Sequence, residues 1–272
     1  MLPWLLLLVL PSTYSLNCSY MFDGTRYSRQ NILTVHGFPM HLRMEPTTND
    51  LIYSLVNLHT SFTGSIYILR NGTSVKVDIK DANVAASDFD QNRVFVGTDH
   101  GLKLLNNKNQ APLDILSFHN KRIIRLFKPV AEDKLFIITQ PNKTVHQLDL
   151  NTFEKSNVES IPSAWQVVAD SEGNIFYVTD SMEYRVLLKD FTDTIQYVGL
   201  NKAKKRALTI DDNNRAIAVT DDGLYWLRPD STMPKKLMNL DFIPRGIVFD
   251  CDDIYISTLN TIYKYSYNDC SS

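Results

Sequence analysis

The sequence predicts an all-β fold, a six-bladed β-propeller that forms a single domain over residues 16–272. Three observations support this prediction: one unit recurs six times, the recurrences are evenly spaced, and only strand-like sequence lies between them. The unit is a strand, a turn rich in Asp and Asn, and a second strand. The second strands are expected to begin 38 to 43 residues apart, at Leu51, Val94, Leu135, Ile175, Ala216 and Ile254.

Each unit continues through a polar loop into a third apolar stretch. The third strands are predicted to begin near Ile66, Leu102, Val145, Val186, Leu224 and Ile262. Fainter fourth strands are expected at 75–79, 113–118, 194–198 and 236–240, with a weak candidate near Val158.

The sixth unit has no fourth strand, because the sequence stops at Ser272. Segment 26–35 precedes the first unit and has no other partner, so we expect it to become the outer strand of the last blade and close the ring. The alternative, an open or sandwich arrangement, would leave a sheet edge exposed. The polar stretch 201–207 is predicted to be a loop between blades.

The first residues are predicted to be a targeting segment. Residues 1–10 form an apolar run too short to span a bilayer, and Thr13 and Ser15 occupy the −3 and −1 positions for cleavage before Leu16. A buried N-terminal strand is the alternative. With 1–15 as a signal peptide and no later stretch of about 18 apolar residues, the mature protein is expected to be secreted.

Cysteine and asparagine placement fits an exported glycoprotein. Cys18 and Cys270 bracket nearly the whole mature chain and are the natural disulfide in an oxidising compartment, although sequence alone does not fix the connectivity. Cys251 would then be free, and we expect a buried, unreactive thiol. Acceptor sequons for N-glycosylation occur at Asn17, Asn71 and Asn142.

Charge and composition limit the kinds of partner that the protein can bind. With 28 Lys and Arg against 30 Asp and Glu, the net charge is −2, which argues against nucleic-acid binding because that needs a clustered basic surface. Hydrophobic residues make up 44% of the chain, enough for a full core. We expect a monomer that binds a small molecule, with no nucleic acid and no membrane.

A candidate ligand site lies where the inner strands begin, around the central axis. Trp165 offers a flat surface for stacking, and Arg206 and Arg245 offer charge for carboxylates. Asn83 and Met40 are predicted to lie at the same end, so the set suits a planar, anionic molecule. Packing or solvated roles are the alternative for each residue. The recurring threonines of this face are expected to satisfy backbone groups, at Thr98, Thr139, Thr179, Thr220 and Thr258.

No catalytic or metal-binding signature is present in the sequence. There is no G-x-S-x-G, H-E-x-x-H, P-loop or C-x-x-C motif, and the spacing of His41, His59 and His100 is not a metal-ligand pattern. The Asp- and Asn-rich turns are better explained as β-turns than as calcium loops. The sequence therefore predicts a protein that is not an enzyme and needs no cofactor.

The chain resembles the insect ommochrome-binding proteins. The segments CSYMFDGTRYSRQNIL, TTNDLIYSL and NRVFVGTDHGLKLL carry the resemblance, together with the terminal cysteine. The matching positions are Gly24, Thr25, Arg29, Thr48, Asn49, Leu51, Ser54, Gly97 and Gly101. The resemblance implies a haemolymph carrier of ommochromes, which are tryptophan-derived pigments that are planar and carry carboxylates, or of their precursor.

Three functional hypotheses follow. The first is a pigment carrier that binds its ligand by stacking and charge pairing, without chemical change. The second is an interaction module that recognises a protein partner on the same face. The third is a lactonase-type hydrolase, because some secreted six-bladed propellers hydrolyse lactones with an axial calcium held by Glu, Asn and Asp. Of the residues expected at the start of the inner strands, only Asn83 is of that type.

Overall fold

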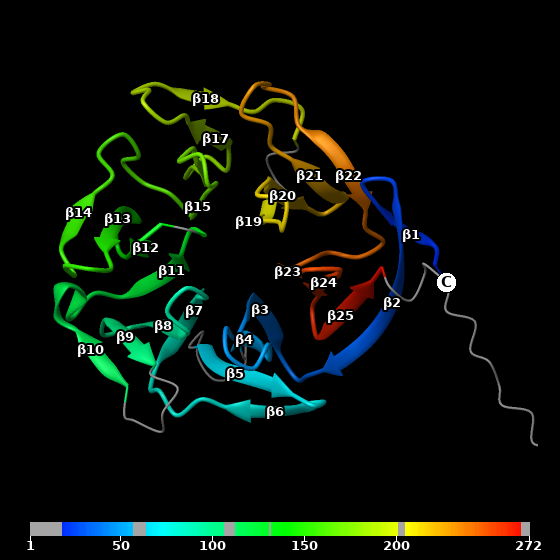
Figure 1. Cartoon of the computed structure of the whole chain (residues 1–272), viewed down its shortest axis with the longest axis horizontal. Coiled ribbons are helices and arrows are strands. Elements are labelled where there is room, and N and C mark those ends of the chain that lie inside the picture. The colour runs from blue at the N-terminus through cyan, green and yellow to red at the C-terminus, as the bar shows by residue number, and fades with distance from the viewer. Residues whose placement is uncertain (1–17, 57–63, 106–111, 131, 201–204, 268–272) are drawn as a thin grey trace, which may run out of the picture.

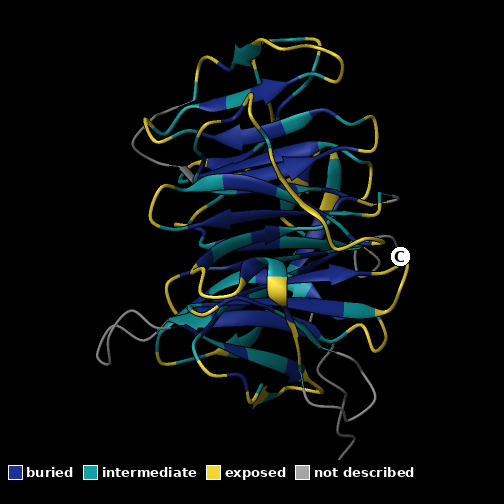
Figure 2. Ribbon diagram, turned by 90° about the vertical axis from the view of Figure 1, so that its left-hand side faces the viewer, coloured by how far each residue is buried: buried dark blue, intermediate teal, exposed yellow. Residues whose placement is uncertain are grey.

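Six antiparallel sheets surround a central axis in the computed structural model, and each turns one strand toward the axis (Figure 1). The structure describes residues 18–56, 64–105, 112–130, 132–200 and 205–267, without the side chains of Lys205 and Arg206. Seen from the side, the buried residues lie in the strands and the exposed ones mostly in the loops at the two faces (Figure 2). The predicted six-bladed β-propeller is confirmed.

Blades 1 to 5 each contain four consecutive strands. Blade 1 consists of β3 (Phe38–Met44), β4 (Leu51–Val56), β5 (Gly64–Arg70) and β6 (Thr73–Lys76). Blade 2 consists of β7 (Ala82–Asp88), β8 (Arg93–Thr98), β9 (Leu102–Leu105) and β10 (Leu113–Ile115). Blade 3 consists of β11 (Ile123–Phe127), β12 (Lys134–Thr139), β13 (Thr144–Asp149) and β14 (Lys155–Asn157). Blade 4 consists of β15 (Gln166–Ala169), β16 (Ile175–Val178), β17 (Tyr184–Leu187) and β18 (Thr194–Gln196). Blade 5 consists of β19 (Lys205–Ile210), β20 (Ala216–Thr220), β21 (Gly223–Trp226) and β22 (Lys235–Asn239).

Blade 6 joins the two ends of the described chain. It consists of β23 (Gly246–Asp250), β24 (Asp253–Ser257), β25 (Thr261–Ser266), β2 (Thr25–Thr34) and β1 (Tyr20–Phe22). Strand β2 pairs antiparallel with β25, from Ser28 opposite Ser266 to Thr34 opposite Thr261. The predicted closing strand is thus confirmed.

Two local predictions need correction. The short strand β1 was not predicted, and it extends blade 6 to five strands by pairing with β2. The loop predicted over 201–207 extends too far, because β19 begins at Lys205 and pairs with β20. Among the described residues the one helical element is a single 3₁₀ turn, η1 (Leu116–Phe118), so no described helix is long and apolar enough to cross a membrane.

The turns use their own side chains as the sequence predicts. Asp170 Oδ1 accepts the backbone N–H groups of Glu172 and Asn174, at 3.1 and 2.8 Å, and this fixes the turn between β15 and β16. On the other face, Thr98 Oγ1 donates to the carbonyl oxygen of Gly101 at 2.9 Å, and Thr220 Oγ1 does the same to Gly223 at 3.0 Å. These Asp and Thr side chains therefore stabilise loops.

The core is divided among the boundaries between blades. Each pair of neighbouring blades encloses one apolar cluster, so every blade packs on both of its neighbours. Between blades 5 and 6, for example, Phe22 and Tyr27 of the N-terminal strands pack with Ile217 and Ile256. The N-terminal strands are consequently part of the core as well as of the sheet.

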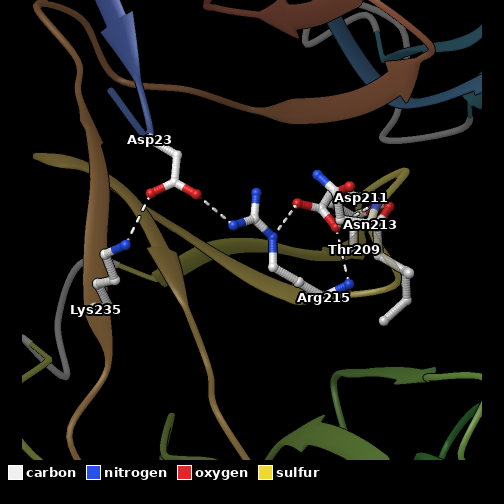
Figure 3. A network of polar contacts seen from close by, with 7 residues as sticks. Asp23, Thr209, Asp211, Asn213, Arg215 and Lys235 are labelled. Atoms are coloured by element: carbon white, nitrogen blue, oxygen red, sulfur yellow. Dashed lines mark hydrogen bonds and ion pairs between the residues drawn. The ribbon is translucent and has the colours of Figure 1, made fainter. Parts of the chain in front are cut away.

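A polar clamp fastens the turn between β1 and β2 to blade 5 (Figure 3). Asp23 accepts from Arg215 Nη1 at 2.5 Å and from Lys235 Nζ at 2.8 Å, and its own N–H donates to the carbonyl of Leu237 at 3.0 Å. Arg215 Nε also lies 2.8 Å from Asp211 Oδ2. The hydrogen bonds from Lys235 and Arg215 hold the pKa of Asp23 below its usual range.

Three sequence predictions fall outside the described residues. The signal peptide of residues 1–15 and the sequon at Asn17 lie in the undescribed N-terminal segment, and Cys270 lies in the undescribed C-terminal one. The Cys18–Cys270 disulfide therefore stays a prediction. Asn71 and Asn142 are both exposed in turns, as an N-glycan requires, but their occupancy also stays a prediction.

We predict that Asp23→Asn lowers the free energy of unfolding by about 1 kcal/mol at pH 7, because it weakens two partly exposed ion pairs. A carboxyl whose pKa is lowered by folding stabilises the protein above its ordinary pKa and loses this effect as the pH falls. The difference from wild type is thus expected to shrink below about pH 4 and to vanish once the pH lies below the lowered pKa of Asp23. Denaturant unfolding at several pH values measures it.

Asp114→Asn is the matched control. Asp114 also pairs with a lysine, Lys103 at 2.6 Å, but both residues belong to blade 2 and bridge no seam. Its effect is expected to stay within about 0.5 kcal/mol. An Asp23→Asn variant as stable as wild type at pH 7 would contradict the clamp.

Candidate functional site

The inner strands end around a pocket on the axis, which we call the C-face pocket, and the face where these strands begin is called the N-face. The pocket has a volume of about 420 Å³, within the range that holds small ligands. Every blade contributes to it through the end of its inner strand or the turn that follows. Its apolar walls are Met44, Phe89, Phe127, Val130, Ile210, Val248 and Phe249.

Two of these apolar side chains are unusually exposed. Phe89 is 55% exposed and Val130 is 68% exposed, although each lies in a turn whose other residues are mostly polar. Large apolar side chains gathered at the mouth of a pocket are typical of a binding site. The pocket therefore suits a ligand with a flat apolar body.

Arg43 forms the floor of the C-face pocket and also lines the axial channel beneath it. Its guanidinium donates to the carbonyl oxygens of Leu42, at 2.8 Å, and Leu126, at 3.4 Å. Within the described residues it has no carboxylate partner. Burial lowers its pKa to about 10, so it keeps its charge at neutral pH. An uncompensated arginine of this kind attracts an anionic group.

The other charges of the pocket are compensated more fully. Lys128 Nζ lies 3.6 Å from Asp88 Oδ1 and 3.4 Å from Asp90 Oδ2. Asp211 is paired with Arg215. Asp212 is the remaining acidic group: burial, together with the nearby charges of Asp211, Asp250 and Asp252, raises its pKa to about 6.

The axial channel continues from Arg43 toward the N-face. It is narrow, with a volume of about 30 Å³, and its polar lining consists of His41, Arg43, Arg125, Gln166 and Arg245. Arg125 donates from Nη1 to the carbonyl oxygen of Ile124 at 2.6 Å and lies 3.2 Å from His41 Nε2. Because arginine can only donate, His41 Nε2 accepts, and the neutral ring carries its proton on Nδ1.

Irregular pairing turns these side chains toward the axis. The register of β3 shifts between Met40 and Arg43, and that of β11 shifts between Ile123 and Arg125. His41 lies in the first bulge with a positive φ of 53°. Bulges re-aim side chains, which explains how charged residues in otherwise apolar strands reach the channel.

The residues predicted to bind a ligand lie at the N-face end of their strands, opposite the C-face pocket. Asn83 donates to Asp99 Oδ1 at 2.7 Å, and Lys143 Nζ lies 4.0 Å from the centre of the Trp165 ring. Arg245 lines the channel, with its guanidinium carbon 5.5 Å from the Phe38 ring. Met40 is half-buried in β3, and the side chain of Arg206 lies outside the described residues. A ligand role for these five residues stays a prediction.

The channel does not fit the calcium ion of the predicted hydrolase alternative. Calcium takes six to eight oxygen ligands, mostly from carboxylates and carbonyls. The residues around the channel include arginines and no carboxylate, and the described part of the chain contains no group of three or more His, Cys, Asp or Glu that could hold a metal. We therefore derive no chemistry through calcium.

Comparison with known proteins supports the propeller fold but identifies no family for the chain. No protein-family model matches the chain, and no characterised protein matches it in sequence. Among solved structures, a gluconolactonase from Xanthomonas campestris is similar with a TM-score of 0.68 and 10% identity over 90% of both chains. A second protein described as a gluconolactonase has a TM-score of 0.68 and 11% identity over 90% of this chain and 93% of its own. An extracellular domain of a hybrid two-component system from Bacteroides thetaiotaomicron has a TM-score of 0.61 and 14% identity over 89% of this chain and 42% of its own.

These similarities correct one prediction. The sequence predicted that the protein is not an enzyme, and the gluconolactonases, which are hydrolases, contradict this prediction because their fold is the same. The prediction failed because it relied on short catalytic motifs, whereas the residues that line a propeller axis are far apart in sequence. None of the comparisons involves an ommochrome-binding protein, so that resemblance stays a prediction.

The sequence contained a signal for the C-face pocket. Phe89 interrupts a turn that otherwise consists of Asp, Gln and Asn, Val130 lies in a turn that also contains Lys, Glu and Asp, and Arg43 and Arg125 interrupt apolar inner strands. A charged residue inside a buried strand needs a partner or a polar lumen. This pattern was available, but it does not reveal which residues face the axis.

Cys251 corrects a further prediction and provides a reporter for this pocket. It was expected to be free and buried; it is free but exposed, because it lies in the short turn between β23 and β24. It lines the C-face pocket. The negative charge of Asp250 is the main cause of its raised pKa, with burial and Asp212 adding to the effect.

We predict that Cys251 reacts slowly with iodoacetamide at pH 7.5 despite its exposure, because the thiolate is the reactive form. Asp250→Asn is expected to increase the alkylation rate roughly threefold, measured by mass spectrometry. Asp133→Asn, in the equivalent turn of blade 3, should leave the rate unchanged. A wild-type rate equal to that of a cysteine in an unfolded peptide would overturn this explanation.

Proposed function

We propose that the protein binds a small aromatic molecule bearing a carboxylate in the C-face pocket. The observation that carries the proposal is a pocket of ligand size whose walls are apolar and partly aromatic and whose floor is an arginine with no carboxylate partner among the described residues. Phe89 and Phe127 would contact the flat body of the ligand, and Arg43 would bind its carboxylate.

Ommochromes and their precursors belong to this chemical class. The resemblance to the ommochrome-binding proteins supports such a ligand, and it also supports secretion into haemolymph. An extracellular domain among the structurally similar proteins agrees with a location outside the cell. The site differs from the one that the sequence predicted, since it lies at the opposite end of the inner strands.

Titration with xanthommatin, followed by visible absorbance, tests the proposal. We expect saturable binding, and we expect Phe89→Ala and Arg43→Gln each to weaken it roughly tenfold, through lost stacking and a lost charge-assisted hydrogen bond respectively. Trp165→Ala on the N-face is the matched aromatic control and should leave the affinity unchanged.

Chemical labelling of Cys251 provides a second readout of location. A bulky maleimide at Cys251 should block binding in the C-face pocket, whereas the N-face is remote from this thiol. Binding that survives labelling and is lost in Trp165→Ala would move the ligand to the N-face. The absence of any saturable binding would refute the pigment as the ligand.

Hydrolysis of a lactone is a second candidate function, favoured by the fold shared with two gluconolactonases. In this reaction water adds to the lactone carbonyl, the ring C–O bond breaks, and the ring oxygen takes up a proton to give a hydroxy acid. Asp212 lines the C-face pocket, where burial and the neighbouring carboxylates raise its pKa to about 6. Because it is largely ionised at neutral pH, Asp212 would accept a proton from the attacking water, and Arg43 would bind the carboxylate product.

Release of acid from D-glucono-1,5-lactone and from the aromatic lactone dihydrocoumarin tests this candidate. The expected result is a rate above spontaneous hydrolysis that EDTA does not change. Asp212→Asn should lose at least about 90% of the rate, in line with the contribution of a general base. Hydrolysis of both lactones at the spontaneous rate would exclude this candidate and leave the binding proposal in place.

A further inference from the structure

Positive charge accumulates in the axial channel without a described counterion. Arg43 and Arg125 both line the narrow channel, and their guanidinium groups contact backbone carbonyls and the His41 ring. Neither guanidinium has a carboxylate partner in the part of the chain that the structure describes. Burial lowers the pKa of each to about 10, so both remain protonated at neutral pH.

Arg125 has unused hydrogen-bonding capacity as well as unused charge. Its Nε is buried and has no hydrogen-bond partner. An unpaired buried charge is strongly destabilising, and an unsatisfied buried donor adds to the cost. His41 does not compensate the positive charge of the guanidinium groups, because its neutral ring carries no negative charge. Among the described residues that line the channel there is therefore no negatively charged group.

The size of the channel limits what can supply that charge. Its volume of about 30 Å³ leaves room for a single ion or water and excludes a sugar or an aromatic ring. A cation would be repelled by both guanidinium groups. A water molecule would satisfy hydrogen bonds and leave the charge uncompensated.

We propose that the axial channel binds one small monovalent inorganic anion, of the size of chloride, between Arg43 and Arg125. The ion would occupy the centre of the propeller and link the inner strands of blades 1 and 3. It would stabilise the fold by compensating part of the charge of two buried cations. The anion site shares Arg43 with the proposed ligand site, but it does not require that ligand, since Arg125 lies outside the C-face pocket.

Thermal unfolding at constant ionic strength tests the proposal, with sodium chloride replacing sodium methanesulfonate, whose anion is too large for the channel. The midpoint of wild type is expected to rise saturably, by roughly 5 °C at a chloride concentration a hundredfold above its dissociation constant. Arg125→Gln should lose this dependence. Without chloride, Arg125→Gln should be at least as stable as wild type, because it removes an unpaired charge.

Arg122→Gln is the matched control, because Arg122 is 45% exposed and pairs with Asp99 at 3.0 Å outside the channel. It should keep the full chloride dependence, and so should Phe89→Ala, which is expected to lose pigment binding only. The experiments can therefore refute the anion proposal without refuting the pigment proposal, and the reverse.

A crystal grown in sodium bromide gives an independent result if Arg125→Gln does not fold. An anomalous bromide peak within about 3.5 Å of the Arg43 and Arg125 guanidinium nitrogens would support the proposal. Equal midpoints of wild type in chloride and methanesulfonate would overturn it, and so would a channel without bromide.

Discussion

The ring of six blades depends on the pairing of β2 with β25, which joins segments more than two hundred residues apart: Ser28 and Ser266, for example, are separated by 238 positions. Without it, β25 would be an exposed edge, and Phe22 and Tyr27 would leave the apolar cluster between blades 5 and 6. The clamp at Asp23 adds charge pairing at the same seam. Ring closure thus determines both the packing of the last blade and the positions of the inner strands around the axis.

Closure of the ring also brings two buried positive charges together at its centre. Six inner strands converge on the axis, and bulges in β3 and β11 direct Arg43 and Arg125 into a lumen too narrow for bulk water. Both charges are retained there without a described acidic partner. An anion in the channel and a carboxylate in the C-face pocket both follow from this single feature, and an axial calcium ion does not. Hydrolysis on this scaffold would have to use its own side chains, with Asp212 of the C-face pocket as the base.

The fold could be predicted from the sequence because its signals are local. Apolar strands, self-capping turns and a spacing near 40 residues defined the blades, and 26–35 was the one strand without a partner. The residues predicted to bind a ligand lie on the N-face, whereas the C-face pocket lies at the other end of the inner strands, and the ligand role of the N-face residues stays a prediction. Alternation along a strand gives its two faces, but bulges such as the one between Met40 and Arg43 change that alternation, and the turn that carries Phe89 reveals its exposure only in three dimensions. Cys251 was predicted to be buried because apolar residues flank it, but it lies in an exposed turn between β23 and β24.

A crystal structure with 5-bromoindole-3-acetate, an aromatic carboxylate with an anomalous scatterer, tests the central claim most directly. We expect the bromine and the ring in the C-face pocket beside Phe89, with the carboxylate on Arg43. Density for the ligand against Trp165 on the N-face would contradict this placement and restore the site predicted from the sequence.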